Sequence, residues 1–366
     1  MNMQKLLESL TGLPQVSRRA AEAYNSRKGL LAESVNLTMA ARQDLARLIG
    51  SKTNIELMQN NHQNHVQFIT TVLHLNAFRL LASVIPWIYL TYHQHGFSFE
   101  YFPVALAAWK QAVINEIPKE LAQEIVPVYD WMLSQHETAV SELSNLPATG
   151  SADLSESAAT FLNSILEKDL PGAVNLALQN TRSEDGLRNF YNTTMQPAMY
   201  EVGARWSRGE ISVADEHMAT AVAQSVVANL QAKTAATAGR RGKAIITAAT
   251  NEQHDLGARM AAHVFETDGW EVVYLGANMP ISDLTHLARR VKPRFIGISV
   301  AMPYNLHHVK RIEEAFKNDV ELKQIKIIVS GIVFRLFPEA ATCLDGINVI
   351  TNLDEAITMT RRWAVG

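Results

Sequence analysis

An acidic residue, a histidine and a glycine stand in the order E-x-H-x-x-G, formed by Glu252, His254 and Gly257. A metal-bound imidazole uses one ring nitrogen for the metal and normally donates its other N–H to a carboxylate or carbonyl. Glu252 has the type and spacing of that acceptor, and Gly257 lets the backbone approach a bulky flat ligand. The three residues predict a metal-ligand loop. The alternative is a histidine that caps the start of a helix.

This segment lies between a predicted strand and a predicted helix. Residues 243–249 form a short apolar run that ends in small residues, and a helical pattern follows from Ala258. A side chain at such a junction leaves the carboxyl edge of a sheet, where open α/β folds bind ligands. The local pattern therefore places His254 where a ligand is expected.

Strands and helices alternate beyond residue 240. Strands are predicted at residues 244–249, 271–275, 295–300, 326–330 and 348–350, with helices between them and a last helix at residues 354–363. This alternation predicts a parallel, doubly wound, five-stranded sheet over residues 240–366.

Small residues end the third and fourth of these strands. They are Ser299, followed by Ser330 and Gly331. Room at that edge suits a long ligand tail, which a serine hydroxyl could bind and a glycine would admit. Ordinary strand-to-helix turn chemistry is the alternative.

Residues 154–238 are predicted to form a four-helix bundle. Turn-forming breaks at residues 169–172, 181–183 and 207–210 separate four helices with short connections, which favours an antiparallel bundle. Ser212 and Asp215 resemble a capping box that starts the last helix at Val213.

Three bundle residues could face one ligand. Trp206 lies ten residues before the pair Glu216 and His217. Tryptophan offers a flat apolar surface to a cofactor, and Glu with His can hydrogen-bond a sugar or a nucleobase. The alternative is a core tryptophan and a solvent-facing polar pair.

Residues 1–150 are predicted to be all-α, with helical periodicity and few strand signals. Residues 87–131 are rich in aromatic side chains and include His93 and His95. Such crowding fits a packed core, and it also fits a pocket for a second flat chromophore. Small, turn-forming residues at 146–153 and 237–242 mark the predicted domain boundaries.

Composition narrows the class of protein. The 366 residues, 47% hydrophobic and 19% charged, indicate two or three globular domains. A net charge of -3 without a basic block argues against nucleic-acid binding. The lone Cys343 excludes an intrachain disulfide and fits a reducing cytoplasm.

Hydropathy argues against a membrane protein. The apolar stretch at residues 68–92 is interrupted by Arg79 and Pro86 among others, so it predicts a buried helix rather than a membrane span. The N-terminus shows no signal-peptide pattern. A cytoplasmic location is expected.

Residues 154–366 closely resemble the cobalamin-binding module of methionine synthase and of CarH-type light-sensing transcription regulators. The resemblance implies a helical bundle over the upper face of cobalamin and a Rossmann-like domain that holds the lower face. His254 would then be the lower axial ligand of cobalt, replacing the cofactor's dimethylbenzimidazole. Glu252 would be its carboxylate partner, and Gly257 would complete the loop.

The resemblance extends to the tail pocket of the lower face. Ser299 matches the serine of an S-x-L segment, with Ala301 in place of leucine. Gly331 matches the second glycine of a G-G segment, and Ser330 replaces the first. These residues would meet the displaced tail of the cofactor.

On the upper face, Trp206, Glu216 and His217 match the W-x9-E-H pattern that light sensors place around an adenosyl group, which implies adenosylcobalamin. CarH-type sensors carry a histidine after that tryptophan, but this chain carries Ser207. A bis-histidine light state built that way is therefore not expected.

A globin-like helical domain before a cobalamin module resembles the photocobilins, photoreceptors that bind a bilin and cobalamin. The resemblance implies biliverdin or another bilin in residues 1–150, bound non-covalently because that region has no cysteine. A haem with His93 or His95 as proximal ligand is another interpretation.

The sequence thus favours a cobalamin-dependent light-sensing regulator rather than an enzyme. Light would break the cobalt–carbon bond, rearrange the domains or a homo-oligomer, and signal to an unidentified partner protein. The alternative is a corrinoid carrier subunit of a methyltransferase or mutase, with the catalytic barrel on a separate chain.

Overall fold

The computed structural model describes residues 3–143, 154–181, 185–233 and 240–364. The chain divides into two compact units, Met1–Pro147 and Ala148–Gly366. The expected boundary at residues 146–153 and the first half of the one at 237–242 lie outside the described residues. Each unit is described by itself.

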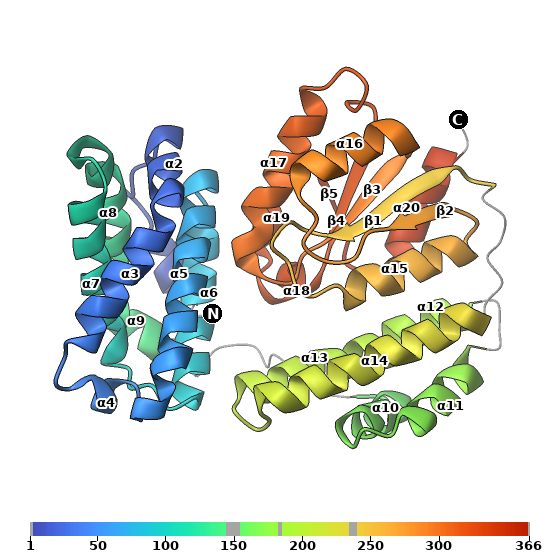
Figure 1. The fold of residues 1–366 in the computed structure, drawn as a ribbon, viewed down its shortest axis with the longest axis horizontal. Helices are drawn as coiled ribbons and strands as arrows, with labels where there is room; N and C mark the ends of the chain where they lie inside the picture. Colours follow the sequence, from blue (N-terminus) through green and yellow to red (C-terminus); the bar gives the residue numbers. More distant parts are fainter. Residues whose placement is uncertain (1–2, 144–153, 182–184, 234–239, 365–366) are drawn as a thin grey trace. The chain divides into compact units, whose positions relative to one another are not determined.

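The N-terminal unit is helical, as the sequence predicts (Figure 1). Its helices are α1 (Met3–Glu8), α2 (Arg18–Ser26), α3 (Lys28–Ala40), α4 (Leu45–Leu48), α5 (Ile55–Leu75), α6 (Phe78–Gln94), α7 (Tyr101–Glu116), α8 (Lys119–Ser134) and α9 (His136–Ser141), with a 3-10 turn η1 (Lys52–Asn54) before α5. Buried aliphatic and aromatic side chains fill the interior, among them Tyr24, Trp109 and Tyr129.

The apolar stretch at residues 68–92 is divided between two helices, which corrects the expectation of one. Asn76 has a φ of 50°, and this left-handed conformation ends α5 before α6 starts at Phe78. The Asn76 side chain accepts a hydrogen bond from Val16 N at 2.7 Å and donates one to Val16 O at 3.1 Å. No helix of the described residues is long and apolar enough to cross a membrane.

The first part of the C-terminal unit is the predicted bundle. It consists of α10 (Glu156–Leu166), α11 (Leu170–Asn180), α12 (Gly186–Phe190), the π-helical η3 (Tyr191–Met195), α13 (Gln196–Ser207) and α14 (Val213–Lys233). Because α12, η3 and α13 follow one another without a break, they act as one long helix of the bundle. The predicted capping box is present: Asp215 N donates to Ser212 Oγ at 3.2 Å, and Ser212 N donates to the Asp215 carboxylate at 3.0 Å.

The second part is a parallel five-stranded sheet in the order β2-β1-β3-β4-β5. The strands are β1 (Lys243–Ala248), β2 (Glu271–Tyr274), β3 (Phe295–Ser299), β4 (Lys326–Ser330) and β5 (Asn348–Val349), each within one residue of its predicted limits. Between and after them come α15 (Leu256–Thr267), α16 (Ile281–Val291), η4 (Pro303–Asn305), α17 (Leu306–Lys317), α18 (Ile332–Leu336), α19 (Glu339–Thr342) and α20 (Leu353–Ala364).

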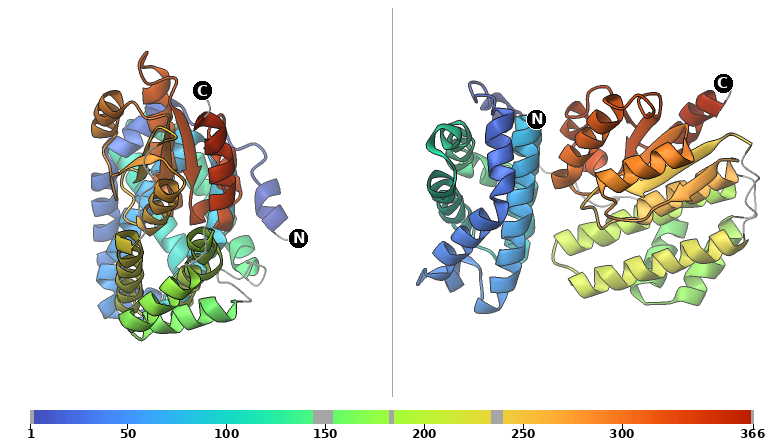
Figure 2. Two further views of the ribbon diagram at one scale, coloured as in Figure 1. Left: turned by 90° about the vertical axis from the view of Figure 1, so that its right-hand side faces the viewer. Right: turned by 45° about the horizontal axis from the view of Figure 1, so that its top comes forward.

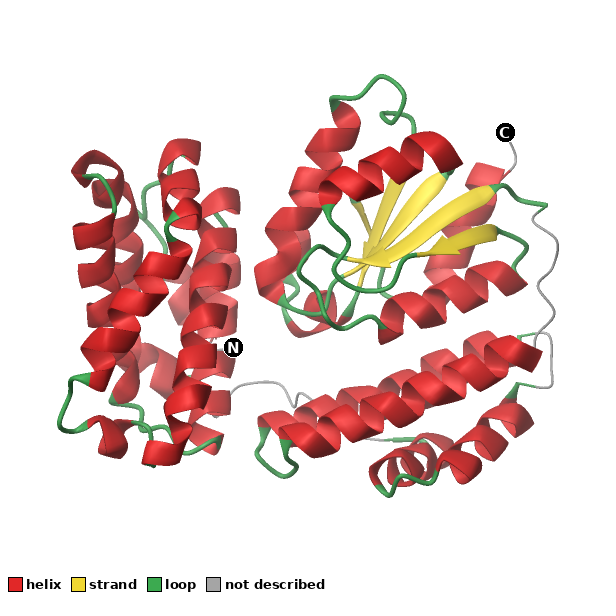
Figure 3. Ribbon diagram, viewed as in Figure 1, coloured by secondary structure: helices red, strands yellow, loops and turns green. Residues whose placement is uncertain are grey.

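Helices cover both faces of this sheet (Figure 3). Helix α15 packs on β1 and β2 and also touches α14 and α20, whereas α16 contacts α17. One buried cluster runs from Phe190 and Val226 of the bundle, through Phe265 of α15, to Phe295 of β3. The bundle and the sheet region, drawn as ribbons in Figure 2, were predicted as two domains but share one buried cluster.

Candidate functional site

The E-x-H-x-x-G loop leaves the carboxyl end of β1 and enters α15. Nδ1 of His254 lies 2.6 Å from Oε1 of Glu252, and the His254 backbone N–H donates to the same oxygen at 3.2 Å. The Glu252 side chain is 1% exposed, whereas that of His254 is 56% exposed. With its Nδ1–H given to the carboxylate, the ring presents Nε2, which has no hydrogen bond within the described residues. This is the arrangement of a metal-binding histidine with a carboxylate partner.

The second oxygen of Glu252 fixes the loop to the end of β3. It accepts hydrogen bonds from Ala301 N and Met302 N, both at 2.9 Å, and from Asn305 Nδ2 at 3.0 Å. Burial alone would raise the pKa of Glu252, but the hydrogen bond and charge of His254, with the other donors, hold it below its ordinary value. The bond to Glu252 in turn raises the pKa of His254, against the effect of burial.

An asparagine follows each of the first three strands, and together they hold the loop. Asn251 and Asn278 have positive φ angles, 64° and 52°, and Asn251 N donates to Asn278 Oδ1 at 2.9 Å. Asn305 is fully buried, accepts from Asn251 Nδ2 at 3.3 Å and donates to Glu252. Sequence reasoning missed these residues, although their recurrence after successive strands was a signal.

The small residues at the strand ends lie beside this loop. Ser299 and Ser330 pair across β3 and β4, both are half-buried, and their hydroxyls make no hydrogen bond within the described residues. A Cβ on Gly257 would lie 3.3 Å from Ser299 Oγ. At position 331 the reason for glycine is different. The φ of Gly331 is 138°, and a Cβ there would lie 1.9 Å from Val300 O. The backbone itself requires that glycine.

The structure separates the predicted bundle residues into two groups. Trp206 and Glu216 are half-buried, and Glu216 lies two turns before Gln224 on α14, whose side chain bonds Asp255 next to His254 at 3.1 Å. Glu216 accepts from Thr220 Oγ1 at 3.0 Å and bonds His217 Nδ1 at 2.5 Å. The His217 side chain is 74% exposed and points away from the core. Ser207 is buried.

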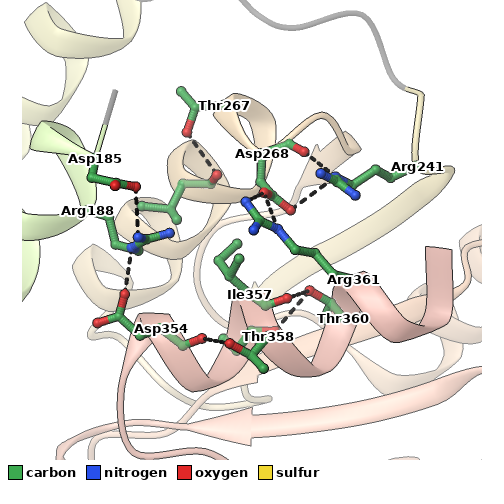
Figure 4. Close-up of polar contacts among 12 residues, drawn as sticks. Asp185, Arg188, Arg241, Thr267, Asp268, Asp354, Ile357, Thr358, Thr360 and Arg361 are labelled. Atoms are coloured by element: carbon green, nitrogen blue, oxygen red, sulfur yellow. Dashed lines mark hydrogen bonds and ion pairs between the residues drawn. The ribbon is translucent and has the colours of Figure 1, made fainter. Parts of the chain in front are cut away.

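Polar contacts also join the bundle to the sheet region elsewhere. Figure 4 shows Arg188 between Asp185 and Asp354, with N–O distances of 2.8 and 2.6 Å. Nearby, the Tyr191 hydroxyl lies 2.9 Å from Nδ1 of His263, a buried bond between η3 and α15. These contacts fix the bundle against α15 and α20 without using the His254 loop.

Two family models, each described as a B12 binding domain, match residues 158–231 and 242–355. The HTH-type transcriptional repressor CarH of Myxococcus xanthus is 28% identical over 109 residues, which are 30% of this chain and 36% of CarH. The dimethylamine corrinoid protein of Methanosarcina barkeri is 27% identical over 135 residues, which are 36% of this chain and 63% of that protein. The matches thus span less than two thirds of either relative.

Among solved structures, the Methanosarcina barkeri monomethylamine corrinoid protein matches with a TM-score of 0.46 and 15% identity, covering 55% of this chain and 95% of the other. A cobalamin-binding protein from Desulfitobacterium hafniense DCB-2 matches with a TM-score of 0.31 and 20% identity, covering 57% and 98%.

The residues at the carboxyl edge fit a cobalt corrinoid. A cobalt corrinoid would need one ligand from the protein, and the exposed His254 ring would supply it through Nε2. The hydroxyls of Ser299 and Ser330, which make no hydrogen bond in the part of the chain that the structure describes, can bind a polar tail, and Gly257 keeps the space beside Ser299 open.

Proposed function

We propose that this chain, whose residues 158–231 and 242–355 form a cobalamin-binding module, is a light-responsive regulator that uses adenosylcobalamin. The observation that carries the proposal is that Glu216 lies on the face of α14 whose Gln224 bonds Asp255, the residue after His254, while Trp206 lies near the end of the preceding helix α13. An aromatic ring and a carboxylate above the cobalt suit a nucleoside ligand better than a methyl group, which offers nothing to stack on or to hydrogen-bond.

The chain's own residues would act as a two-state device. His254 holds cobalt from the lower side, and Glu252 keeps the Nδ1 proton and the ring orientation. When bound, adenosylcobalamin would supply a light-sensitive cobalt–carbon bond. Trp206 and Glu216 would contact the adenosyl group, so its loss would remove contacts of the bundle, and the changed packing would pass to a homo-oligomer or a partner protein.

Reconstitution tests this function directly. The full chain is loaded with adenosylcobalamin in the dark, and absorption spectra and size-exclusion profiles are recorded before and after illumination. We expect a spectral change together with a change in hydrodynamic size or in partner binding. Spectra and profiles that light leaves unaltered in a loaded protein would contradict the proposal.

A corrinoid carrier subunit is the second candidate. Its support is the match to the dimethylamine corrinoid protein, which covers 63% of that relative against 36% of CarH. The helical unit Met1–Pro147 lies outside both matched family models and is more than a carrier needs. Methyl transfer to or from the loaded chain in the presence of a methyltransferase, with no response to light, would favour the carrier.

A second chromophore in the N-terminal unit remains part of the proposal. Its core brings imidazole and aromatic rings together. The ring centres of His65 and Trp109 are 4.6 Å apart, and Nε2 of His65 lies 3.3 Å from the Tyr129 hydroxyl. These ring types suit a flat tetrapyrrole. His93, by contrast, is exposed and donates from Nδ1 to Phe97 O at 3.0 Å, and His95 lies at the end of α6.

Titration with biliverdin and with haem separates the two tetrapyrroles. Red absorption that appears on adding biliverdin supports a non-covalent bilin, and a Soret band without red absorption supports haem. A His65→Phe variant that binds biliverdin as wild type does would exclude the His65 region as the pocket.

A further inference from the structure

Asp255 directly follows His254 and occupies the N-cap position of α15, yet it does not cap its helix. Aspartate at this position normally accepts a hydrogen bond from the second or third backbone N–H of the helix, and the cap stabilises the helix by about 1 kcal/mol. The backbone at Asp255 has φ -101° and ψ -8°, and no such side-chain bond is formed. Its carboxylate is therefore committed to other partners.

The two carboxylate oxygens of Asp255 bind different parts of the unit. Oδ1 accepts from Nε2 of Gln224, on bundle helix α14, at 3.1 Å. Oδ2 accepts from the hydroxyl of Tyr274, at the end of β2, at 2.7 Å. The Arg259 guanidinium lies 5.3 Å from the centre of the Tyr274 ring and holds that side chain from the helix side. One carboxylate beside the axial histidine thus bridges the bundle and the sheet.

Gln224 lies on the face of α14 that carries the upper-side residues. Glu216, Thr220 and Gln224 follow one another at steps of four, which places them along one side of a helix. Other links between the bundle and the sheet region, among them Arg188 with Asp354, Tyr191 with His263 and Arg335 over the Tyr200 ring, do not involve the His254 loop. Gln224 thus connects the face of α14 that carries Glu216 to the loop that carries His254.

We propose that Gln224 and Asp255 are positioning residues: they make the orientation of the His254 ring depend on whether bundle helix α14 lies against the His254 loop. With α14 against the loop, Gln224 and Tyr274 hold both oxygens of Asp255 and so fix the His254–Asp255 peptide. When α14 withdraws, Oδ1 is released, and the side chain turns to cap α15, which rotates that peptide and loosens His254. The proposal rests on the cobalamin site described above and assigns it a mechanical link between its two sides.

The first test uses the full chain without cofactor. Gln224→Leu removes the donor, Gln224→Lys keeps one of similar reach, and Gln231→Leu makes the same change seven residues later at a side chain with no hydrogen bond in the described structure. We expect hydrogen exchange of amides 252–258 to rise at least severalfold in Gln224→Leu alone, with unchanged urea midpoints. Equal exchange in Gln224→Leu and Gln231→Leu would overturn the proposal.

The second test reads the cobalt ligand. The variants are loaded with cobalamin, reduced to the cob(II) state and examined by electron paramagnetic resonance with 15N-labelled histidine, which reports axial histidine. We expect full histidine ligation in wild type and Gln224→Lys, a mixture in Gln224→Leu, and roughly tenfold weaker cobalamin binding in Gln224→Leu, the size of a lost charge-assisted hydrogen bond. Wild-type ligation and affinity in Gln224→Leu would refute the coupling.

The two failures are distinguishable. If wild type binds no cobalamin, the proposed function is wrong. If wild type binds it through His254 and Gln224→Leu behaves as Gln231→Leu does, the function stands and the positioning role does not.

Discussion

Glu252 bonds Nδ1 of His254 at 2.6 Å through one carboxylate oxygen, while its other oxygen receives the backbone N–H groups of Ala301 and Met302. The imidazole is therefore tied to the ends of two neighbouring strands through a single buried side chain. Rotating the ring away from the carboxyl edge would break a charge-assisted bond. The imidazole is therefore held in one orientation, and such preorganisation lowers the entropic cost of binding a ligand.

His254→Ala should remove axial histidine ligation and leave the fold intact, because the side chain is largely exposed. Loss of a metal ligand typically lowers affinity more than loss of its hydrogen-bonding partner, which costs 10- to 100-fold. Equilibrium binding of cobalamin and the cob(II) resonance spectrum measure the change. Gln253→Ala, the exposed neighbour, serves as control. Histidine-type ligation that persists in His254→Ala would show that another residue binds cobalt.

Glu252→Gln should destabilise the protein without cofactor by about 1–3 kcal/mol, because the amide places N–H groups against donors that the carboxylate satisfied. The pKa of Glu252 in the folded protein lies below its ordinary value of 4.5. The ionised carboxylate therefore stabilises the folded state fully above pH 4.5, and this stabilisation is lost as the pH falls through the folded-state pKa. Urea unfolding at pH 7 and pH 4 checks both points. Glu216→Gln, half-buried on α14, should change stability by less than about 0.5 kcal/mol.

Gly257→Ala should affect the stability of the protein without cofactor and its affinity for cobalamin in opposite directions. Gly257 is the second residue of α15, where alanine is favoured over glycine by up to about 1 kcal/mol, so stability without cofactor should hold or rise. The new Cβ would press on Ser299 Oγ at 3.3 Å and narrow the space proposed for the tail, so cobalamin affinity should fall. Thermal unfolding and cobalamin titration measure the two effects. Unchanged affinity would mean that the tail does not pass between Gly257 and Ser299.

The N-terminal unit should lose stability in weak acid because of His62. Burial lowers the pKa of this histidine from 6.5 to about 4, and the ring is bonded between Asn36 at 2.5 Å and Tyr101 at 2.8 Å. Below pH 6.5 the unfolded chain takes up a proton that the folded state excludes, so stability is complete above 6.5 and falls as pH drops toward 4. The contribution of His62 to the loss between pH 7 and 5 is on the order of 2 kcal/mol, and His65, whose pKa is lowered by burial to about 3, adds to it.

Imidazole NMR shifts measure this directly, with urea unfolding at both pH values. A neutral His62 ring at pH 5 is expected in the folded chain. A ring that titrates near its ordinary pKa in the folded state would contradict the burial argument.

The sheet was predictable from sequence because each strand is a short apolar run closed by turn residues, so β3 and β4 end at Ser299 and Ser330 as expected. The pairing of Glu252 with His254 followed from their spacing alone. The link from Asp255 to Gln224 did not, because it joins residues 31 apart on different elements and Asp255 had an obvious local role as a cap. Asn76 was missed for a related reason: its left-handed backbone interrupts an apolar pattern that continues on both sides.

Ser207→His tests whether the position after Trp206 can supply an upper cobalt ligand. Ser207 is 5% exposed and packs inside the bundle, so an imidazole there should overfill the core and destabilise the chain by about 1–3 kcal/mol. The buried ring should not reach the cobalt, and the illuminated spectrum of the loaded variant should match that of wild type. Ala214→His, at an exposed position of α14, introduces the same ring without the strain. Absorption typical of two axial histidines, present only in illuminated Ser207→His, would show that the helix turns to bring position 207 over the cobalt.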